Sequence, residues 1–81
     1  MEPPNRAQQL YLEGRVAREI DGDPASAVRL FGESLVEDPR NVEAYFDRAI
    51  ALRRLGRYED AVESFRTGFA LSARVRRPKG P

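Results

Sequence analysis

The 81-residue sequence contains neither cysteine nor histidine. These two absences exclude disulfide bonds, thiolate nucleophiles and imidazole bases, and they remove the side chains that most zinc sites use. Long apolar runs are missing as well, because no stretch approaches the roughly 18 apolar residues of a membrane span and the opening MEPPNRAQQL lacks the apolar run of a signal peptide. We therefore expect a cytoplasmic protein that binds no metal or cofactor and inserts into no membrane.

Charge is distributed unevenly along the chain, although the formal net charge is only +1. All 13 acidic residues lie within residues 1–73, whereas the last eight residues carry four cations, Arg74, Arg76, Arg77 and Lys79. The sequence thus combines one small, mildly acidic body with a short basic tail. A body of this size buries only about 60% of the surface of its unfolded chain, so we expect neighbouring copies or partners to add stability.

An internal repeat is the strongest signal in the sequence. The stretches GDPASAVRLF (22–31) and GRYEDAVESF (56–65) share a glycine, an Ala-Val pair and a phenylalanine at a spacing of 34 residues. Four pairs further upstream are separated by 35 residues: Leu10 and Tyr45, Gly14 and Ala49, Ala17 and Leu52, and Ile20 and Leu55. One extra residue in the turn near Asp21 explains the change of spacing, because insertions in surface turns cost little.

Each unit is predicted to be a pair of helices. The upstream positions recur at i, i+4, i+7 and i+10, which places them on one helical face. Asp23 before Pro24 and Asn41 are typical of helix starts, while Gly22 and Gly56 can adopt the positive φ of a helix end. No run alternates with the period of two that a strand requires. The predicted helices lie near 6–20, 24–37, 42–55 and 59–73.

A 34-residue helix-turn-helix unit with a small residue at its helix crossing, an aromatic four residues later and Asp-Pro at its end resembles the tetratricopeptide repeat family. The matching positions are Tyr45, Ala49, Leu52, Gly56, Tyr58, Ala61 and Phe65 in the second unit, and Leu10, Gly14, Gly22, Ala27, Phe31 and Pro39 in the first. Pro24 stands where the second unit has Tyr58, and Ala73 replaces the closing proline. The resemblance implies an all-α fold of two stacked repeats with four antiparallel helices, a short α-solenoid. The expected parts are a flexible N-terminus (1–5), repeats at 6–39 and 40–73, and a flexible basic tail (74–81).

Catalysis is not expected. The acidic pairs Glu37-Asp38, Asp21/Asp23 and Glu59-Asp60 all fall at helix ends, where capping and the helix dipole explain them. The glycines are too isolated to form a phosphate-binding loop. We therefore expect a protein that acts by binding and not as an enzyme.

In tetratricopeptide repeat proteins the first helices of successive units line a concave groove that holds an extended peptide or a helix. The resemblance therefore directs attention to the faces of helices 6–20 and 42–55 that are not used for packing. The candidate groove residues are an aromatic pair, an isoleucine and four arginines: Tyr11, Arg15, Arg18, Phe46, Ile50, Arg53 and Arg54. Such a face can hold an apolar side chain and pair with acidic neighbours. The alternative is ordinary helix surface, with Phe46 or Ile50 packed against the neighbouring unit.

The family's carboxylate clamp for chaperone C-termini uses Lys and Asn residues over three repeats. The matching positions here hold Tyr11, Arg15 and Asp47, there is no third repeat, and Asp47 would repel a carboxylate. The sequence therefore argues against a cochaperone of that kind. A protein or peptide partner of another sort is expected.

The basic tail, SARVRRPKGP, offers an alternative function in which four cations attach the protein to nucleic acid or to an anionic membrane surface. It lacks interleaved aromatic residues and any apolar anchor. Four charges alone give weak, salt-sensitive attachment, so a solvated terminus is favoured over a nucleic-acid partner.

The last predicted helix carries more apolar residues than one packing face can use. Val62, Phe65, Phe69 and Leu71 lie along it, and only one side can pack against the preceding helix. Phe69 and Leu71 are predicted to remain uncovered. The simplest cover is a second copy around a two-fold axis, which gives a homodimer, and the alternatives are the folded-back tail or a longer repeat array.

Overall fold

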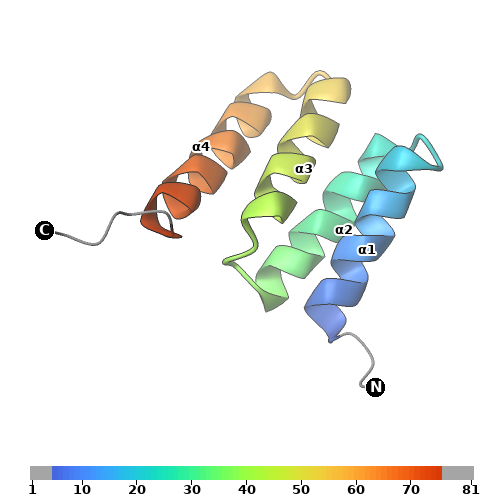
Figure 1. Cartoon of the computed structure of the whole chain (residues 1–81). Helices are drawn as coiled ribbons and strands as arrows, with labels where there is room; N and C mark the ends of the chain where they lie inside the picture. Colours follow the sequence, from blue (N-terminus) through green and yellow to red (C-terminus); the bar gives the residue numbers. More distant parts are fainter. Residues whose placement is uncertain (1–4, 76–81) are drawn as a thin grey trace, which may run out of the picture.

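The computed structural model describes residues 5–75, which form four α-helices joined by short turns (Figure 1). The helices are α1 (Arg6–Glu19), α2 (Pro24–Glu37), α3 (Val42–Arg54) and α4 (Tyr58–Val75). Residues 5–75 contain no strand, so the predicted all-α fold is confirmed. The expected start of the basic tail at Arg74 falls inside α4, and the cations at 76–79 lie outside the described residues.

The helix starts follow from side-chain capping. Asn5, Asp23 and Asn41 each accept a hydrogen bond from the backbone N–H three residues on, at 2.8, 3.1 and 3.1 Å. Hydrogen bonds from Ser26 hold the pKa of Asp23 below its ordinary value, because they favour the charged carboxylate. Gly22 and Gly56 have φ of +62° and +79° in the turns after α1 and α3, as predicted.

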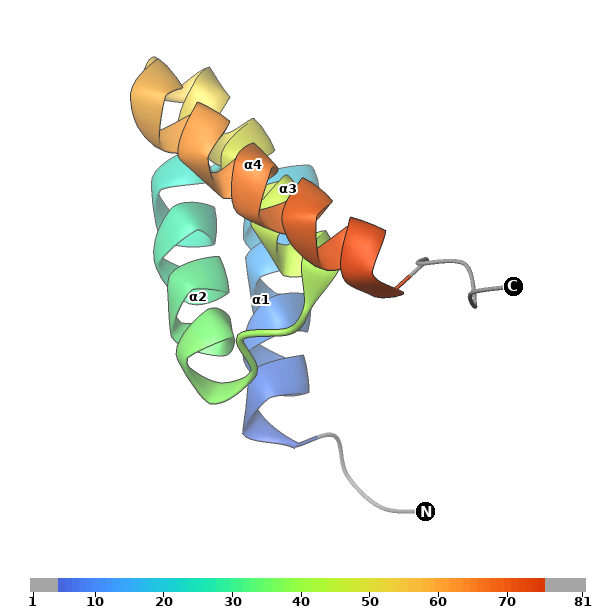
Figure 2. The ribbon, with the colours of Figure 1, turned by 90° about the vertical axis from the view of Figure 1, so that its left-hand side faces the viewer.

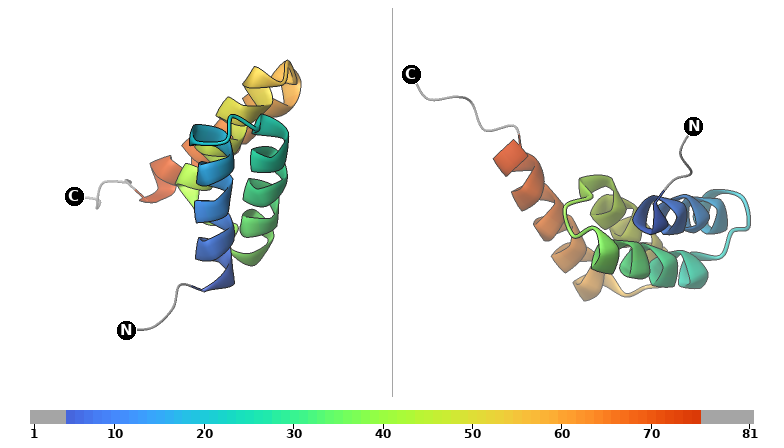
Figure 3. Two further views of the ribbon diagram at one scale, coloured as in Figure 1. Left: turned by 90° about the vertical axis from the view of Figure 1, so that its right-hand side faces the viewer. Right: turned by 90° about the horizontal axis from the view of Figure 1, so that it is seen from below.

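The helices form two antiparallel pairs, and the two pairs lie one beside the other in a row (Figures 1 and 2). α1 packs mainly on α2 and α3 mainly on α4, while α2 and α3 join the two pairs. Among the described helices, α4 packs on α3 alone. Its last turns extend away from the other helices when the molecule is seen from below (Figure 3). One side of α4 is therefore left without a helix against it.

Small residues allow the helices of each pair to approach closely. A Cβ on Gly14 would lie 2.7 Å from the Phe31 ring, and a Cβ on Gly68 would lie 2.6 Å from the Phe46 ring. The two rings thus lie directly on helix backbone, which fixes the distance between the helices of each repeat.

The core is continuous across the two repeats. One buried cluster combines Ala17, Ala27 and Phe31 of repeat 1 with Ala51 of α3. A second cluster contains Ala49, Leu52 and Ala61, and half-buried Val28 of α2 packs against both clusters. Two buried serines satisfy their hydroxyls on a neighbouring helix: Ser34 donates to the Ala7 carbonyl at 2.7 Å and Ser64 to the Tyr45 carbonyl at 2.8 Å.

Candidate protein-binding surfaces

A polar network joins α1 to α3 along the predicted groove. The Tyr11 hydroxyl donates to Asp47 Oδ2 at 2.8 Å, and Arg18 Nη2 donates to Asp47 Oδ1 at 3.3 Å. The Arg18 and Asp47 side chains are only 18% and 16% exposed, so water competes weakly for them. Burial and the hydrogen bond to Asp47 raise the pKa of the Tyr11 hydroxyl well above its ordinary value, because ionisation would place a second negative charge beside the carboxylate.

Two of the four predicted groove arginines have their charge paired within the protein. Arg15 Nη2 lies 3.3 Å from Glu19 Oε2, and Arg18 Nη2 lies 3.3 Å from Glu19 Oε1 in addition to its bond with Asp47. The hydrogen bond to Glu19 raises the pKa of Arg15. Asp47 is likewise engaged, so the repulsion that it was expected to exert on a carboxylate is offset by Arg18. The contacts of Tyr11 and Arg18 with Asp47 thus join the two repeats, whereas the pairs with Glu19 lie within α1.

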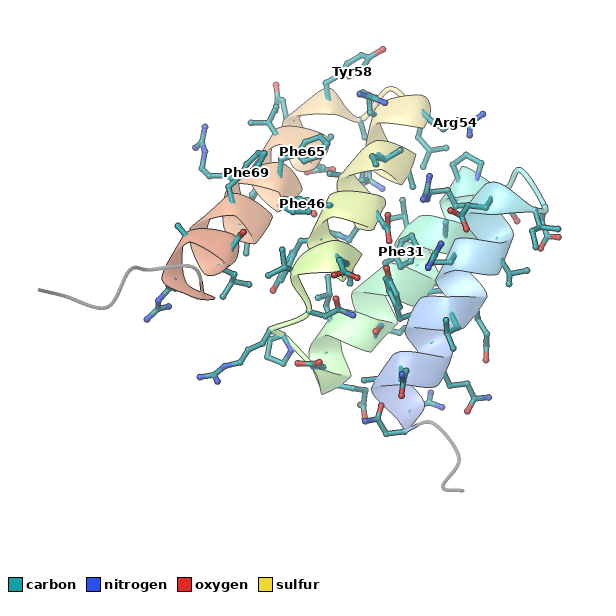
Figure 4. The ribbon with its side chains drawn as sticks, in the orientation of Figure 1. Phe31, Phe46, Arg54, Tyr58, Phe65 and Phe69 are labelled. Atoms are coloured by element: carbon teal, nitrogen blue, oxygen red, sulfur yellow. The ribbon has the colours of Figure 1, made fainter. Side chains whose placement is uncertain are left out.

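The predicted aromatic pair does not form a single cluster, because each ring packs inside its own repeat. The Tyr11 and Phe31 ring centroids are 5.7 Å apart. Phe46 packs with Phe69 at 5.1 Å and with Phe65 at 6.2 Å, between α3 and α4 (Figure 4). The structure therefore places Phe46 in the packing of its own repeat, and not against the neighbouring unit as the alternative from the sequence supposed.

The end of α3 carries the remaining candidates. Arg53 and Arg54 are exposed in the last turn of the helix, and Arg54 lies at its upper end in Figure 4. Neither makes an ion pair with any residue in the range 5–75. Half-buried Ile50 precedes them by one helical turn and shares their side of α3. Ile50, Arg53 and Arg54 form what we call the α3 site.

A second surface lies on α4. Val62, Phe65, Arg66 and Phe69 line an open, mostly apolar hollow of about 410 Å³. Phe69 is 63% exposed and Val62 is 52% exposed. Leu71 is half-buried and follows the helical stripe of Ala61, Ser64 and Gly68, so Val62 accompanies Phe69 on the exposed side where Leu71 was expected. We call these four lining residues the α4 face.

A third surface lies at the opposite end of the row and was missed from the sequence. Leu12, Glu13 and Val16 line a hollow of about 610 Å³ on α1, together with residues of α2. Leu12 and Val16 are nearly half exposed, and Glu13 is also exposed. The repeat register indicates this surface, because it matches Leu12, Glu13 and Val16 with Asp47, Arg48 and Ala51 of α3. These α3 residues contact the preceding repeat. We call Leu12, Glu13 and Val16 the α1 face.

Neither metal binding nor membrane spanning has a structural counterpart in the described range. Residues 5–75 bring together no group of three His, Cys, Asp or Glu side chains that would hold a metal ion. None of the helices described has the length and apolar character needed to cross a bilayer.

The helical pairs, their close crossings and their side-by-side stacking define a helical-repeat protein of the class that presents its surfaces to other proteins. The sequence profile described as tetratricopeptide repeat matches residues 11–72. The chain therefore belongs to the tetratricopeptide repeat family, as its repeat predicted.

Two relatives are similar to this chain, and the human one is named for the same repeat. An uncharacterized protein of Methanocaldococcus jannaschii is 38% identical over 74 residues, which cover 91% of this chain and 85% of that protein. Human tetratricopeptide repeat protein 28 is 34% identical over 61 residues, which cover 75% of this chain and only 2% of the human protein. No solved structure matches the chain.

Proposed function

We propose that this protein is a non-enzymatic adaptor that binds an acidic peptide or helix of a partner protein along the predicted groove on α1 and α3, which we call the α1/α3 face. The observation that carries this proposal is the α3 site, where two exposed arginines without an ion pair among residues 5–75 flank a half-buried isoleucine. Family membership supports the general role, because tetratricopeptide repeats commonly mediate protein–protein interactions.

The chemistry of the α3 site defines the ligand. A guanidinium pairs with a carboxylate through two parallel hydrogen bonds, so an Asp or Glu of the partner meets Arg53 or Arg54. An apolar side chain next to that acid covers Ile50. The network of Tyr11, Arg18 and Asp47 supports the site by fixing α1 against α3, whereas the charge of Arg15 is already paired with Glu19.

An affinity capture followed by titration of the captured partner's peptide tests this proposal. Arg53→Ala combined with Arg54→Ala is expected to weaken binding by about tenfold or more, because two charge-assisted contacts are removed. Arg29→Ala with Arg40→Ala removes the same charge from exposed positions outside the α1/α3 face and should leave affinity unchanged. Equal binding by both double variants, with helicity intact, would refute the α3 site.

We further propose that the chain self-associates through the α4 face. Phe69 and Val62 present a contiguous apolar surface at the free end of the row, and full burial of each such side chain is worth about 1.5–3 kcal/mol. Phe69→Glu is expected to convert the homodimer, or any larger assembly, into a monomer. Sedimentation equilibrium checks this, and a wild-type chain that stays monomeric at high concentration would exclude self-association.

The basic tail supplies the alternative function, attachment to nucleic acid or to an anionic membrane surface. Most of its cations lie outside the described residues. Removal of residues 76–81 and a salt titration separate the two functions, because binding through the tail would fall steeply with ionic strength whereas groove binding would survive the truncation.

A further inference from the structure

The exposed α4 face has a covered counterpart inside the molecule. The repeat register, a shift of 34 residues, matches Phe65 with Phe31 and Arg66 with Gly32 of α2. Phe31 is fully buried, whereas Phe65 is only half-buried and lines an open hollow. The difference arises because α3 packs on that side of α2, while no described helix packs on that side of α4.

The residues of α3 that make this internal contact also have counterparts. Ala51 is fully buried in the cluster around Phe31, and the Arg48 Nε atom lies 3.9 Å from the position of a Cβ on Gly32. The register, here a shift of 35 residues, matches Ala51 with Val16 and Arg48 with Glu13. Both counterparts lie on the exposed α1 face. The exposed α4 face therefore corresponds to the α2 side of the internal α2–α3 contact, and the exposed α1 face corresponds to its α3 side.

We propose that copies of this chain stack head to tail, with α1 of one copy occupying on α4 of another the place that α3 occupies on α2. This proposal rests on the self-association proposed above and specifies its geometry. It differs from a two-fold dimer because the α4 face meets the α1 face and not itself.

Charge supports this pairing. At the internal contact, Arg48 of α3 faces Gly32 of α2. At the matching positions of the stacked contact, Arg66 of one copy faces Glu13 of the next. Two exposed side chains of opposite charge are therefore brought together. In a two-fold pairing of α4 faces, Arg66 would instead approach its own symmetry mate.

A second matched change supports it independently. The Tyr11 hydroxyl of α1 meets the Asp47 carboxylate of α3 inside the molecule. The register matches Tyr11 with Phe46 and Asp47 with Leu12, so the same place in the stacked contact holds Phe46 against Leu12 of the next copy. Both members of the polar pair are thus replaced by apolar residues at the stacked contact. Leu12 is 47% exposed in the single chain, and stacking would cover it.

Head-to-tail contact has a consequence for size. A heterologous contact that does not close on itself leaves one free α1 face and one free α4 face at every stage, so association continues beyond the dimer. The mean mass should therefore rise steadily with concentration and pass twice 9.2 kDa. A two-fold dimer would stop at that value.

Charge reversal tests the proposal directly. We expect Glu13→Arg alone and Arg66→Glu alone each to weaken association by about tenfold, since each places like charges together. An equimolar mixture of the two variants restores association, because Arg at 13 then meets Glu at 66. The variant that carries both changes restores it as well. Sedimentation velocity over a range of concentrations measures all of these samples.

Glu37→Arg and Arg40→Glu provide matched controls, since both positions are exposed and lie away from the two faces. They should associate as the wild-type chain does. A wild-type chain that stays monomeric would overturn both this inference and the proposed self-association. Association that stops at the dimer, depends on Phe69 and ignores Glu13 would overturn head-to-tail stacking while supporting the self-association. Single reversals that associate like wild type would also overturn it.

Discussion

The two repeats have the same layout, but the matching side chains have different surroundings. Phe31 in α2 is enclosed by α1 behind it and α3 in front, and none of its surface is exposed. Phe65 in α4 packs against α3 and beside Phe46 and Phe69, but no described helix covers its other side. The difference lies in the neighbouring helix and not in the repeat itself.

A repeat of this kind therefore completes its core only when the next helix is present. Repeat 1 receives that helix from within the chain, because α3 supplies Ala51 to its core. Repeat 2 lacks such a helix among the described residues, and Phe69 consequently remains 63% exposed. Stability should therefore be unequal between the repeats, and variants at matching positions should have unequal effects.

The largest expected difference concerns the two matching phenylalanines. Phe31→Ala should cost about 3–5 kcal/mol, because it opens a cavity in a closed core. Phe65→Ala should cost about 2 kcal/mol, because the side chain is already partly hydrated in the wild-type chain. Urea unfolding monitored by circular dichroism measures both free energies of unfolding, at a protein concentration low enough to keep the chain monomeric. Equal losses would show that the two repeats are covered alike.

A smaller difference is expected at the two glycines beneath aromatic rings. Alanine gains about 1 kcal/mol over glycine in a helix interior, but its Cβ would overlap Phe31 at Gly14 and Phe46 at Gly68. Phe31 has no space to move, so Gly14→Ala should be destabilising by about 1–2 kcal/mol net. Phe46 is half-buried and can shift, so Gly68→Ala should be nearly neutral. A greater loss of unfolding free energy for Gly68→Ala than for Gly14→Ala would contradict this prediction.

The smallest expected difference comes from the polar contact of repeat 1. Tyr11→Phe removes the hydrogen bond to Asp47 and should cost about 1 kcal/mol at pH 7. Because folding raises the pKa of Tyr11, its contribution is present below the ordinary value of 10.0 and is lost as the pH rises above it. The variant should therefore lose less stability than wild type between pH 9 and pH 11.

The control for this variant is Tyr58→Phe, since Tyr58 is 65% exposed at the start of α4. Its unfolding free energy should match wild type at neutral pH. The account of Tyr11 is contradicted if both variants show the same pH dependence as wild type in urea titrations.

Much of the fold was predictable from the sequence because its signals are local. Caps at Asp23 and Asn41 and positive φ at Gly22 and Gly56 each depend on a few neighbouring residues. The 34-residue period spans the two units, but it is visible directly as matching residues in the sequence. The helix ends were consequently correct to within two residues.

The surfaces were less predictable, because they depend on which helix packs against which. Periodicity places Phe46 on a face but does not reveal that its ring lies on the backbone at Gly68. The pairing of Arg18 with Asp47 joins residues 29 positions apart, and no local pattern indicates it. Val62 and Arg66 are exposed because no described helix packs on their side of α4, and the sequence of α4 alone does not indicate which side stays uncovered.

The most direct test of the central claim, that repeat 2 is completed by α1 of another copy, is the concentration dependence of backbone amide chemical shifts. The account predicts that shifts change together on two separate surfaces, around Leu12, Glu13 and Val16 on α1 and around Val62, Arg66 and Phe69 on α4. Residues in the buried α2–α3 contact should stay constant. Shifts that change on α4 alone, or that do not change at all up to millimolar concentration, would contradict it.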